Sequence, residues 1–119
     1  MPVKEDSIGK IDISKAAVAT IANRSVNQCY GVVGMANKSI VTGISSMLSR
    51  ESRRGIDVMI EDEQIVIDVY VIIEYGTRIR VVAEGIQNTV KFHVERAIGI
   101  PVRAVNVYVH GLRLSESKA

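Results

Sequence analysis

The clearest pattern of apolar and polar positions lies between residues 64 and 75, where the two kinds of side chain alternate. One face of an extended chain would carry six apolar or aromatic residues: Ile65, Ile67, Val69, Val71, Ile73 and Tyr75. The other face would carry Gln64, Asp68, Tyr70 and Glu74. A period of two with many β-branched residues is typical of a strand. We therefore predict a long strand over residues 64–75.

Helical spacing follows this strand and then gives way to a second alternation. Gly76 interrupts the strand pattern, and Thr77 is a residue type that caps helices. Apolar positions then recur at helical spacing, at Ile79, Val82, Ile86, Val90, His93 or Val94, and Ala97. Gly99 and Pro101 end this pattern, and alternation resumes over residues 102–109. A strand, a helix and a strand in succession predict a crossover that places both strands in one sheet.

The first third of the chain predicts shorter elements. Residues 9–13 alternate briefly and indicate an edge strand, and Ser14 is a suitable N-cap. A narrow apolar stripe then predicts a first helix, with Val18, Ile21, Ala22, Ser25, Val26 and Cys29 on it. Gly31 ends that helix. The apolar run at residues 31–36 indicates a buried strand, in which Gly34 would allow close backbone approach.

The segment before the long strand has the weakest signals. Residues 37–49 have apolar positions at helical spacing, but Gly43 and several serines disfavour a helix there. Residues 50–55 form a charged loop, and residues 56–61 alternate as a strand. The turn at residues 61–64 lacks the favoured Asn-Gly pair, so the register of the resulting hairpin stays open.

These elements predict an α+β fold in two layers. A mixed β-sheet has helices packed on one face, and a β-hairpin is followed by a β-α-β crossover. A chain of 119 residues with 47% apolar residues is expected to form one domain, at residues 9–114. Residues 1–8 are expected to be a short flexible N-terminus and residues 115–119 a polar tail.

Composition narrows the classes of function. Fifteen basic and thirteen acidic residues leave a net charge of +2, which is too small to indicate nucleic acid. The single cysteine excludes an internal disulfide and fits a reducing compartment. No secretion signal precedes the domain, and no uncharged run reaches the ~20 apolar residues that a membrane span needs. We expect a cytoplasmic protein that reaches a membrane only through a partner.

A search for catalytic, cofactor or metal sites finds no convincing constellation. Cys29, His93 and His110 have no metal-ligand spacing. Cys29 continues an apolar stripe, which is typical of a buried structural cysteine. Asp68 and Glu74 would lie roughly 20 Å apart along one strand, too far to act as an acid-base pair. We therefore predict no enzyme activity, no cofactor and no metal.

Two features point to binding. The first is a basic cluster proposed to contact an anion or an acidic partner, comprising Arg50, Arg53, Arg54, Arg78 and Arg80. The simpler alternative is that these arginines are exposed to solvent and bind no partner. The second is an apolar set proposed as a partner surface, comprising Ile40, Ile44, Met47 and Leu48. The simpler alternative is that these four side chains close one end of the hydrophobic core. Gly85, midway along the main predicted helix, costs about 1 kcal/mol relative to alanine, and close packing would explain it.

The order of several short motifs resembles the alkaline shock protein family of bacteria, also called the general-stress or envelope-stress-response family. The motifs are GVVG at residues 31–34, EYG with RI at residues 74–79, and VNV at residues 105–107. The resemblance spans about residues 9–112. It implies a small α+β domain without catalytic activity, in a family of cytoplasmic proteins linked to envelope homeostasis. At least one relative self-associates and is recruited to the membrane by a small membrane-anchored partner.

Two departures from the family pattern affect this expectation. Arg80 stands where the family commonly has proline, and the extensions at both ends are short, which argues against membrane recruitment. The favoured function is a non-catalytic structural or interaction protein linked to envelope stress, envelope homeostasis or lipid homeostasis. It would act through a homo-oligomer or a protein partner, with a membrane-anchored protein among the candidates. The alternative is a small RNA-binding module, for which Tyr70 and Tyr108 are the only plausible stacking platform.

Overall fold

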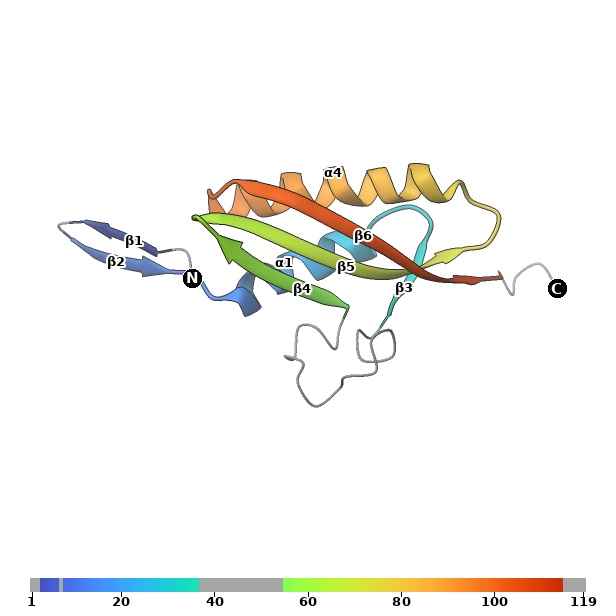
Figure 1. The fold of residues 1–119 in the computed structure, drawn as a ribbon, viewed down its shortest axis with the longest axis horizontal. Coiled ribbons are helices and arrows are strands. Elements are labelled where there is room, and N and C mark those ends of the chain that lie inside the picture. Colours follow the sequence, from blue (N-terminus) through green and yellow to red (C-terminus); the bar gives the residue numbers. More distant parts are fainter. Residues whose placement is uncertain (1–2, 7, 37–54, 115–119) are drawn as a thin grey trace.

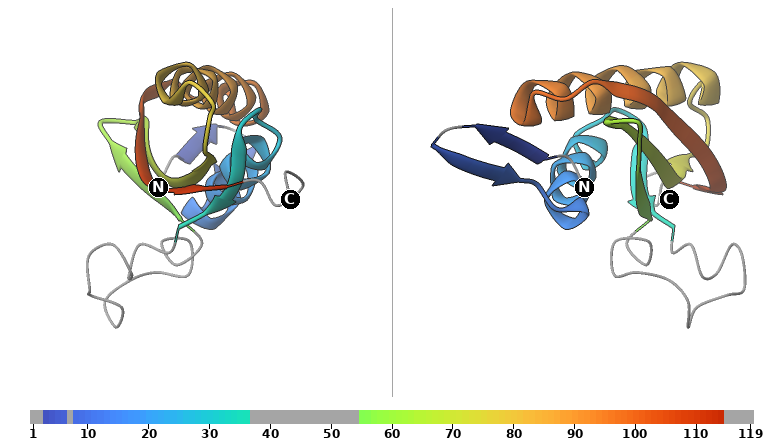
Figure 2. Two further views of the ribbon diagram at one scale, coloured as in Figure 1. Left: turned by 90° about the vertical axis from the view of Figure 1, so that its right-hand side faces the viewer. Right: turned by 60° about the vertical axis from the view of Figure 1, so that its left-hand side comes forward.

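The computed structural model describes residues 3–6, 8–36 and 55–114 of the chain. These residues form a mixed α+β fold whose helices pack on one face of a sheet, as predicted (Figure 1). The elements in order are β1 (Val3–Asp6), β2 (Gly9–Asp12), α1 (Lys15–Asn27), β3 (Val32–Met35), β4 (Ile56–Glu61), β5 (Gln64–Glu74), α4 (Ile79–Ile98) and β6 (Val102–Arg113). The left-hand view of Figure 2 shows α1 and α4 on the same side of the curved sheet.

Strand β5 lies at the centre of the sheet and has neighbours along both edges. β6 runs parallel to it, with Ile67 opposite Val105. This pairing confirms the predicted β-α-β crossover. The other edge of β5 is shared by two antiparallel strands, because β4 pairs with residues 64–69 and β3 pairs with residues 71–73.

β3 and β4 meet at Tyr70 of β5. The Ala36 amide donates to the Tyr70 carbonyl at 2.9 Å, and the Tyr70 amide donates to the Gly55 carbonyl at 2.9 Å. The chain therefore leaves the sheet at Ala36 and returns at Gly55 at one point of the β5 edge. The proposed partner surface of Ile40, Ile44, Met47 and Leu48 falls between these points, outside the described residues, and stays a prediction.

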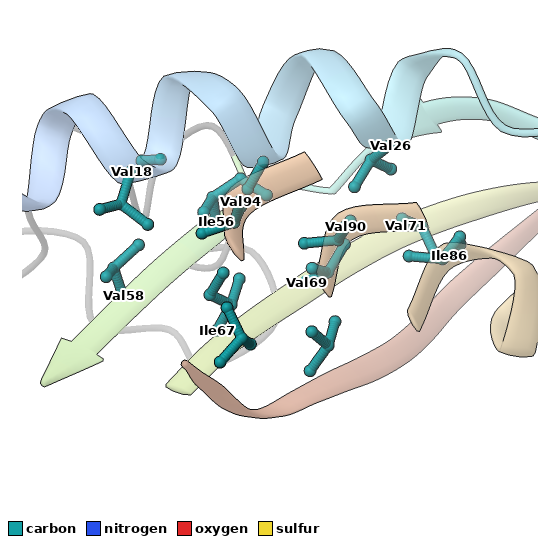
Figure 3. Close-up of a cluster of buried hydrophobic side chains, with 14 of the residues drawn as sticks. Val18, Val26, Ile56, Val58, Ile67, Val69, Val71, Ile86, Val90 and Val94 are labelled. Atoms are coloured by element: carbon teal, nitrogen blue, oxygen red, sulfur yellow. The ribbon is translucent and has the colours of Figure 1, made fainter. Parts of the chain in front are cut away.

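The core is aliphatic and lies between the helices and one face of the sheet. Figure 3 shows side chains of α1, α4, β4 and β5 meeting there. Its fully buried members include Val18, Val26, Ile56, Ile67, Val69, Val71, Ile86, Val90 and Val94. Val94 rather than His93 continues the buried stripe of α4, which settles the alternative that the periodicity left open. Burial of each such side chain contributes about 1.5–3 kcal/mol.

The hairpin between β4 and β5 has a two-residue turn. Glu61 pairs with Gln64, and the intervening Asp62 and Glu63 have φ angles of 51° and 62°. Two consecutive positive φ angles are typical of a type I′ turn, whose twist matches that of the flanking strands. The turn thus fixes the register without the Asn-Gly pair that usually forms it.

The helix ends agree with the predictions except at the end of α1, which stops at Asn27 before the expected Gly31, and at the start of α4. The Ser14 hydroxyl accepts a hydrogen bond from the Ala17 amide at 3.1 Å, and Gly99 ends α4 with a φ of 82°. The prediction that Thr77 caps α4 is wrong. Its hydroxyl donates to the Glu74 carbonyl at 2.8 Å, in the turn after β5, and Arg78 occupies the N-cap without a side-chain cap.

The N-terminal residues differ from the expected flexible segment and edge strand. β1 and β2 pair antiparallel as a separate hairpin, with Val3 opposite Asp12, and β2 joins no other described strand. The short polar β1 segment has no apolar alternation, so its pairing with β2 left no signal in the sequence. Figure 1 shows this hairpin projecting from the body. We call residues 3–6 and 8–12 the arm.

Two glycines have surroundings opposite to those predicted. A Cβ atom added to Gly34 or to Gly85 would find no heavy atom within 4 Å, so neither allows a close approach. Close packing occurs instead at Gly31, where a Cβ atom would lie 2.7 Å from Val82 Cγ2. Periodicity cannot reveal this difference, because it depends on which element packs over each position.

Candidate interaction surface

Two troughs lie along the outer seam between α1 and α4. The Gly85 trough has a volume of about 320 Å³ and is lined by Gln28, Cys29, Tyr30, Val81, Val82, Gly85 and Thr89. The His93 trough has a volume of about 350 Å³ and is lined by Thr20, Ile21, Arg24, Ser25, Gln28, His93 and Ala97. Gln28 lines both, so they form neighbouring parts of one seam.

The Gly85 trough has a mainly apolar lining, and no side chain fills it at position 85. Gly85 lies in the middle of α4, and its missing side chain leaves open space above the helix. Tyr30, which is 80% exposed, and Val81, which is 56% exposed, line the same trough. Open space over a helix-interior glycine, beside exposed apolar side chains, leaves room for an apolar group from outside.

Further exposed apolar side chains lie on the segments that meet where β5 and β6 end. We call this set the end patch, and it comprises Tyr30, Tyr75, Ile79, Val81, Leu112 and Leu114. Backbone contacts hold its elements together. The Glu74 amide donates to the Gly31 carbonyl, and the Tyr75 amide donates to the Arg113 carbonyl, both at 2.8 Å. Clustered exposed apolar groups are typical of interaction sites.

The start of α4, beside the end patch, is electropositive. Arg78 is the N-cap, no acidic residue occupies the first turn, and no side chain caps the helix. Arg80 forms an exposed ion pair with Glu84 at 3.3 Å, which contributes little to stability. Of the proposed basic cluster, Arg78 and Arg80 are therefore exposed near this helix end. Arg50, Arg53 and Arg54 lie outside the described residues.

The arm presents apolar groups at the opposite end of the molecule. Ile8, in its turn, is 93% exposed, and Ile11 of β2 is 57% exposed. All four residues of β2 are exposed, and among the described elements β1 and β2 make extensive contacts only with each other. Figure 1 shows the arm at one end of the long axis and the end of β6 at the other.

Ser25 and His93 form a hydrogen bond at the seam, which sequence reasoning did not anticipate. Ser25 Oγ lies 2.9 Å from His93 Nδ1 and also donates to the Ile21 carbonyl at 2.9 Å. A hydroxyl has one proton, so His93 Nδ1–H is the donor in the first bond. His93 therefore does not accept the proton of Ser25, and Ser25 is only 3% exposed. This arrangement ties α1 to α4 and does not resemble a nucleophile with its base.

Cys29 lies beside this pair at the end of α1. Burial raises the pKa of its thiol, and a hydrogen bond with the Thr89 side chain lowers the pKa by a smaller amount. The thiol donates to the Ser25 carbonyl at 3.4 Å. A raised pKa keeps the thiol protonated near neutral pH and so disfavours nucleophilic chemistry.

Tyr70 and Tyr108 lie opposite each other on β5 and β6, on the sheet face away from the helices. Their rings stack with centroids 4.8 Å apart and planes 16° apart. Tyr70 is only 7% exposed and Tyr108 is 46% exposed. Beside them, the Asn106 amide donates to an Asp68 carboxylate oxygen at 2.8 Å. The two rings thus cover each other, and only Tyr108 presents much ring surface.

Other kinds of site find no support among the described residues. No group of three or more His, Cys, Asp or Glu side chains there is placed to hold a metal ion. None of the helices in the described ranges is long and apolar enough to cross a membrane.

Comparisons with known proteins agree with the fold and the motifs. The uncharacterized protein YloU of Bacillus subtilis is 45% identical over 109 residues, covering 90% of this chain and 91% of its own. An uncharacterized Streptococcus pyogenes protein is 37% identical over 108 residues, covering 89% of each chain. The uncharacterized Bacillus subtilis protein YqhY is 23% identical over 114 residues, covering 95% of this chain and 84% of its own. No solved structure matches significantly.

The family assignment rests on a match to nearly the whole chain. The sequence model that matches describes a family with a cell envelope-related function, and it aligns with residues 3–114. This range contains every helix and strand that the structure describes. The chain belongs to the alkaline shock protein family, whose function is related to the cell envelope.

Proposed function

We propose that this chain serves its envelope-related function as a non-catalytic interaction protein that associates with further copies of itself. The observation that carries this proposal is the placement of exposed apolar side chains at opposite ends of the molecule. Ile8 and Ile11 lie on the arm, and the end patch lies at the far end of the long axis (Figure 1). Burying apolar groups against another chain removes them from water and favours association.

The arm gives independent support. A two-stranded hairpin is marginally stable in water without a third strand or a surface to pack on. Among the described elements, β1 and β2 make no extensive contact with the body of their own chain. A surface supplied by another chain would provide the missing packing. The assignment as non-catalytic is supported by the hydrogen bonding of Ser25 and by the raised pKa of Cys29.

A protein partner of another kind is the second way in which the same surfaces could act. The arm and the end patch would then bind a heterologous chain, and a membrane-anchored partner would place the protein at the membrane periphery. A cytoplasmic location, expected from the single cysteine, is part of this proposal.

The RNA-binding alternative has less support. Base stacking needs exposed ring faces, whereas Tyr70 and Tyr108 stack on each other and Tyr70 is 7% exposed. The net charge of +2 supplies little attraction for phosphate.

The test is the mass of the full chain in solution, measured by light scattering across a concentration series. Self-association predicts a weight-average mass that rises with concentration above the 13.0 kDa of the monomer. A constant monomer mass up to high concentration would contradict self-association. Capture from lysate at low and high salt would then separate a protein partner from nucleic acid, since binding to nucleic acid falls steeply with salt.

A further inference from the structure

We propose that the arm of one copy docks in the Gly85 trough of the next copy, with Ile8 and Ile11 as its apolar contacts. This inference rests on the proposed self-association and identifies both halves of the contact. The arm supplies a protruding apolar group, and the trough supplies an open hollow on the seam between α1 and α4 of the next copy.

The trough has the size and lining that such a group requires. Its volume is about 320 Å³, and Tyr30 and Val81 on its walls are largely exposed. Gly85 weakens α4 as a helix-interior glycine, yet a Cβ atom there would meet no described heavy atom within 4 Å. An isoleucine from another copy would occupy the space that a side chain at position 85 would otherwise take.

The charges of the two surfaces are complementary. The arm sequence contains Glu5, Asp6 and Asp12 against two lysines, which gives it a net negative charge. The start of α4, beside the trough, has Arg78 at an uncapped N-terminus and no acidic residue in its first turn. Acidic groups are favoured at the positive end of a helix dipole, so an arm docked here would supply the missing negative charge.

In this structure the arm does not reach the trough of its own chain. The arm projects from one end of the long axis, whereas α4 packs in the body of the molecule, and neither β1 nor β2 makes an extensive contact with it (Figure 1). The contact is therefore heterologous, with different surfaces on its two sides. Such contacts either close into rings or continue as open chains.

The experiment uses two full-length variants that each remove one side of the contact. The arm variant carries Ile8→Asp and Ile11→Asp, and the trough variant carries Gly85→Phe, which fills the cavity. Each is expected to weaken association by at least roughly tenfold, because the contact loses buried apolar surface. The matched control is Phe92→Asp, at a residue that is 55% exposed and lies outside both surfaces. It should associate as the wild type does.

Mixing the two variants gives the decisive measurement. The arm variant keeps an intact trough and the trough variant keeps an intact arm, so an equimolar mixture should form a one-to-one heterodimer and nothing larger. Circular dichroism of each variant checks that the body stays folded. If the wild type assembles and either variant assembles equally well, the docking contact is wrong while self-association stands. If the wild type itself remains a monomer, the proposed function fails as well.

Discussion

Gly31 and Val82 are packed so closely that a Cβ atom at position 31 would lie 2.7 Å from Val82 Cγ2. Gly31 also has a φ of 87°, a conformation that residues with a Cβ atom rarely adopt. Val82 is 4% exposed and has little room to move. We expect Gly31→Ala to lower the free energy of unfolding by about 2–4 kcal/mol, measured by urea denaturation.

Gly34→Ala is the matched control for this prediction. Gly34 lies in the same short segment, but a Cβ atom there would find no heavy atom within 4 Å. Its effect on the free energy of unfolding should stay within about 0.5 kcal/mol. Equal effects of the two substitutions would mean that the contact between Gly31 and Val82 is not formed.

The turn between β4 and β5 is a site where the chain should be easy to stabilise. Asp62 and Glu63 both have positive φ angles, and such an angle costs energy for Glu63 in particular, because glycine, asparagine and aspartate are the residues that tolerate it. We expect the double substitution Asp62→Asn and Glu63→Gly to raise the free energy of unfolding by about 1 kcal/mol, seen as a higher Tm. The double substitution Asp62→Ala and Glu63→Ala removes the same two charges without this conformational freedom, so a comparable gain from it would contradict the explanation.

The strongly periodic half of the chain could be predicted from sequence because local pattern and caps agree there. β5, α4 and β6 each have a clear period, and Gly99 ends α4 as expected. Their parallel pairing followed from the order of elements. That β3 and β4 share one edge of β5 could not be predicted, because the pairing joins segments separated by residues 37–54.

The candidate surface was harder to predict because it depends on what lies above each residue. Gly85 has a sequence signal, as a glycine inside a helix, but the signal does not distinguish close packing from open space. The Thr77 hydroxyl donates to the Glu74 carbonyl and therefore does not cap α4, so Arg78 is the N-cap instead. No spacing rule could show this. The exposure of Ile8 and Ile11 depends on the arm leaving the sheet.

Gly85 and Gly99 should respond to alanine in opposite directions. Gly85 has open space above it inside α4, so Gly85→Ala should raise the free energy of unfolding by about 1 kcal/mol. Gly99 has a φ of 82° at the helix end, so Gly99→Ala should lower it by about 1 kcal/mol. Thermal denaturation of both variants beside the wild type makes the comparison. A loss of stability in Gly85→Ala would show that position 85 is packed within its own chain.

The titration of Cys29 should make stability fall at alkaline pH. Burial raises the pKa of the folded thiol above its ordinary value of 9.0, so folding favours the protonated form. The resulting stabilisation is fully present below that ordinary value, and it is lost as pH rises through the folded pKa. Cys29→Ser retains a hydroxyl that can donate to the Ser25 carbonyl but does not titrate in this range.

The measurement is the free energy of unfolding of wild type and Cys29→Ser by urea denaturation at several pH values between about 7 and 10.5. Every other ionisable group is common to both proteins, so its contribution cancels in the difference between them. That difference should be constant near neutral pH and should shift against the wild type as pH rises above the ordinary pKa of a thiol. A difference that stays flat over the whole range would mean that folding leaves the pKa of Cys29 unchanged.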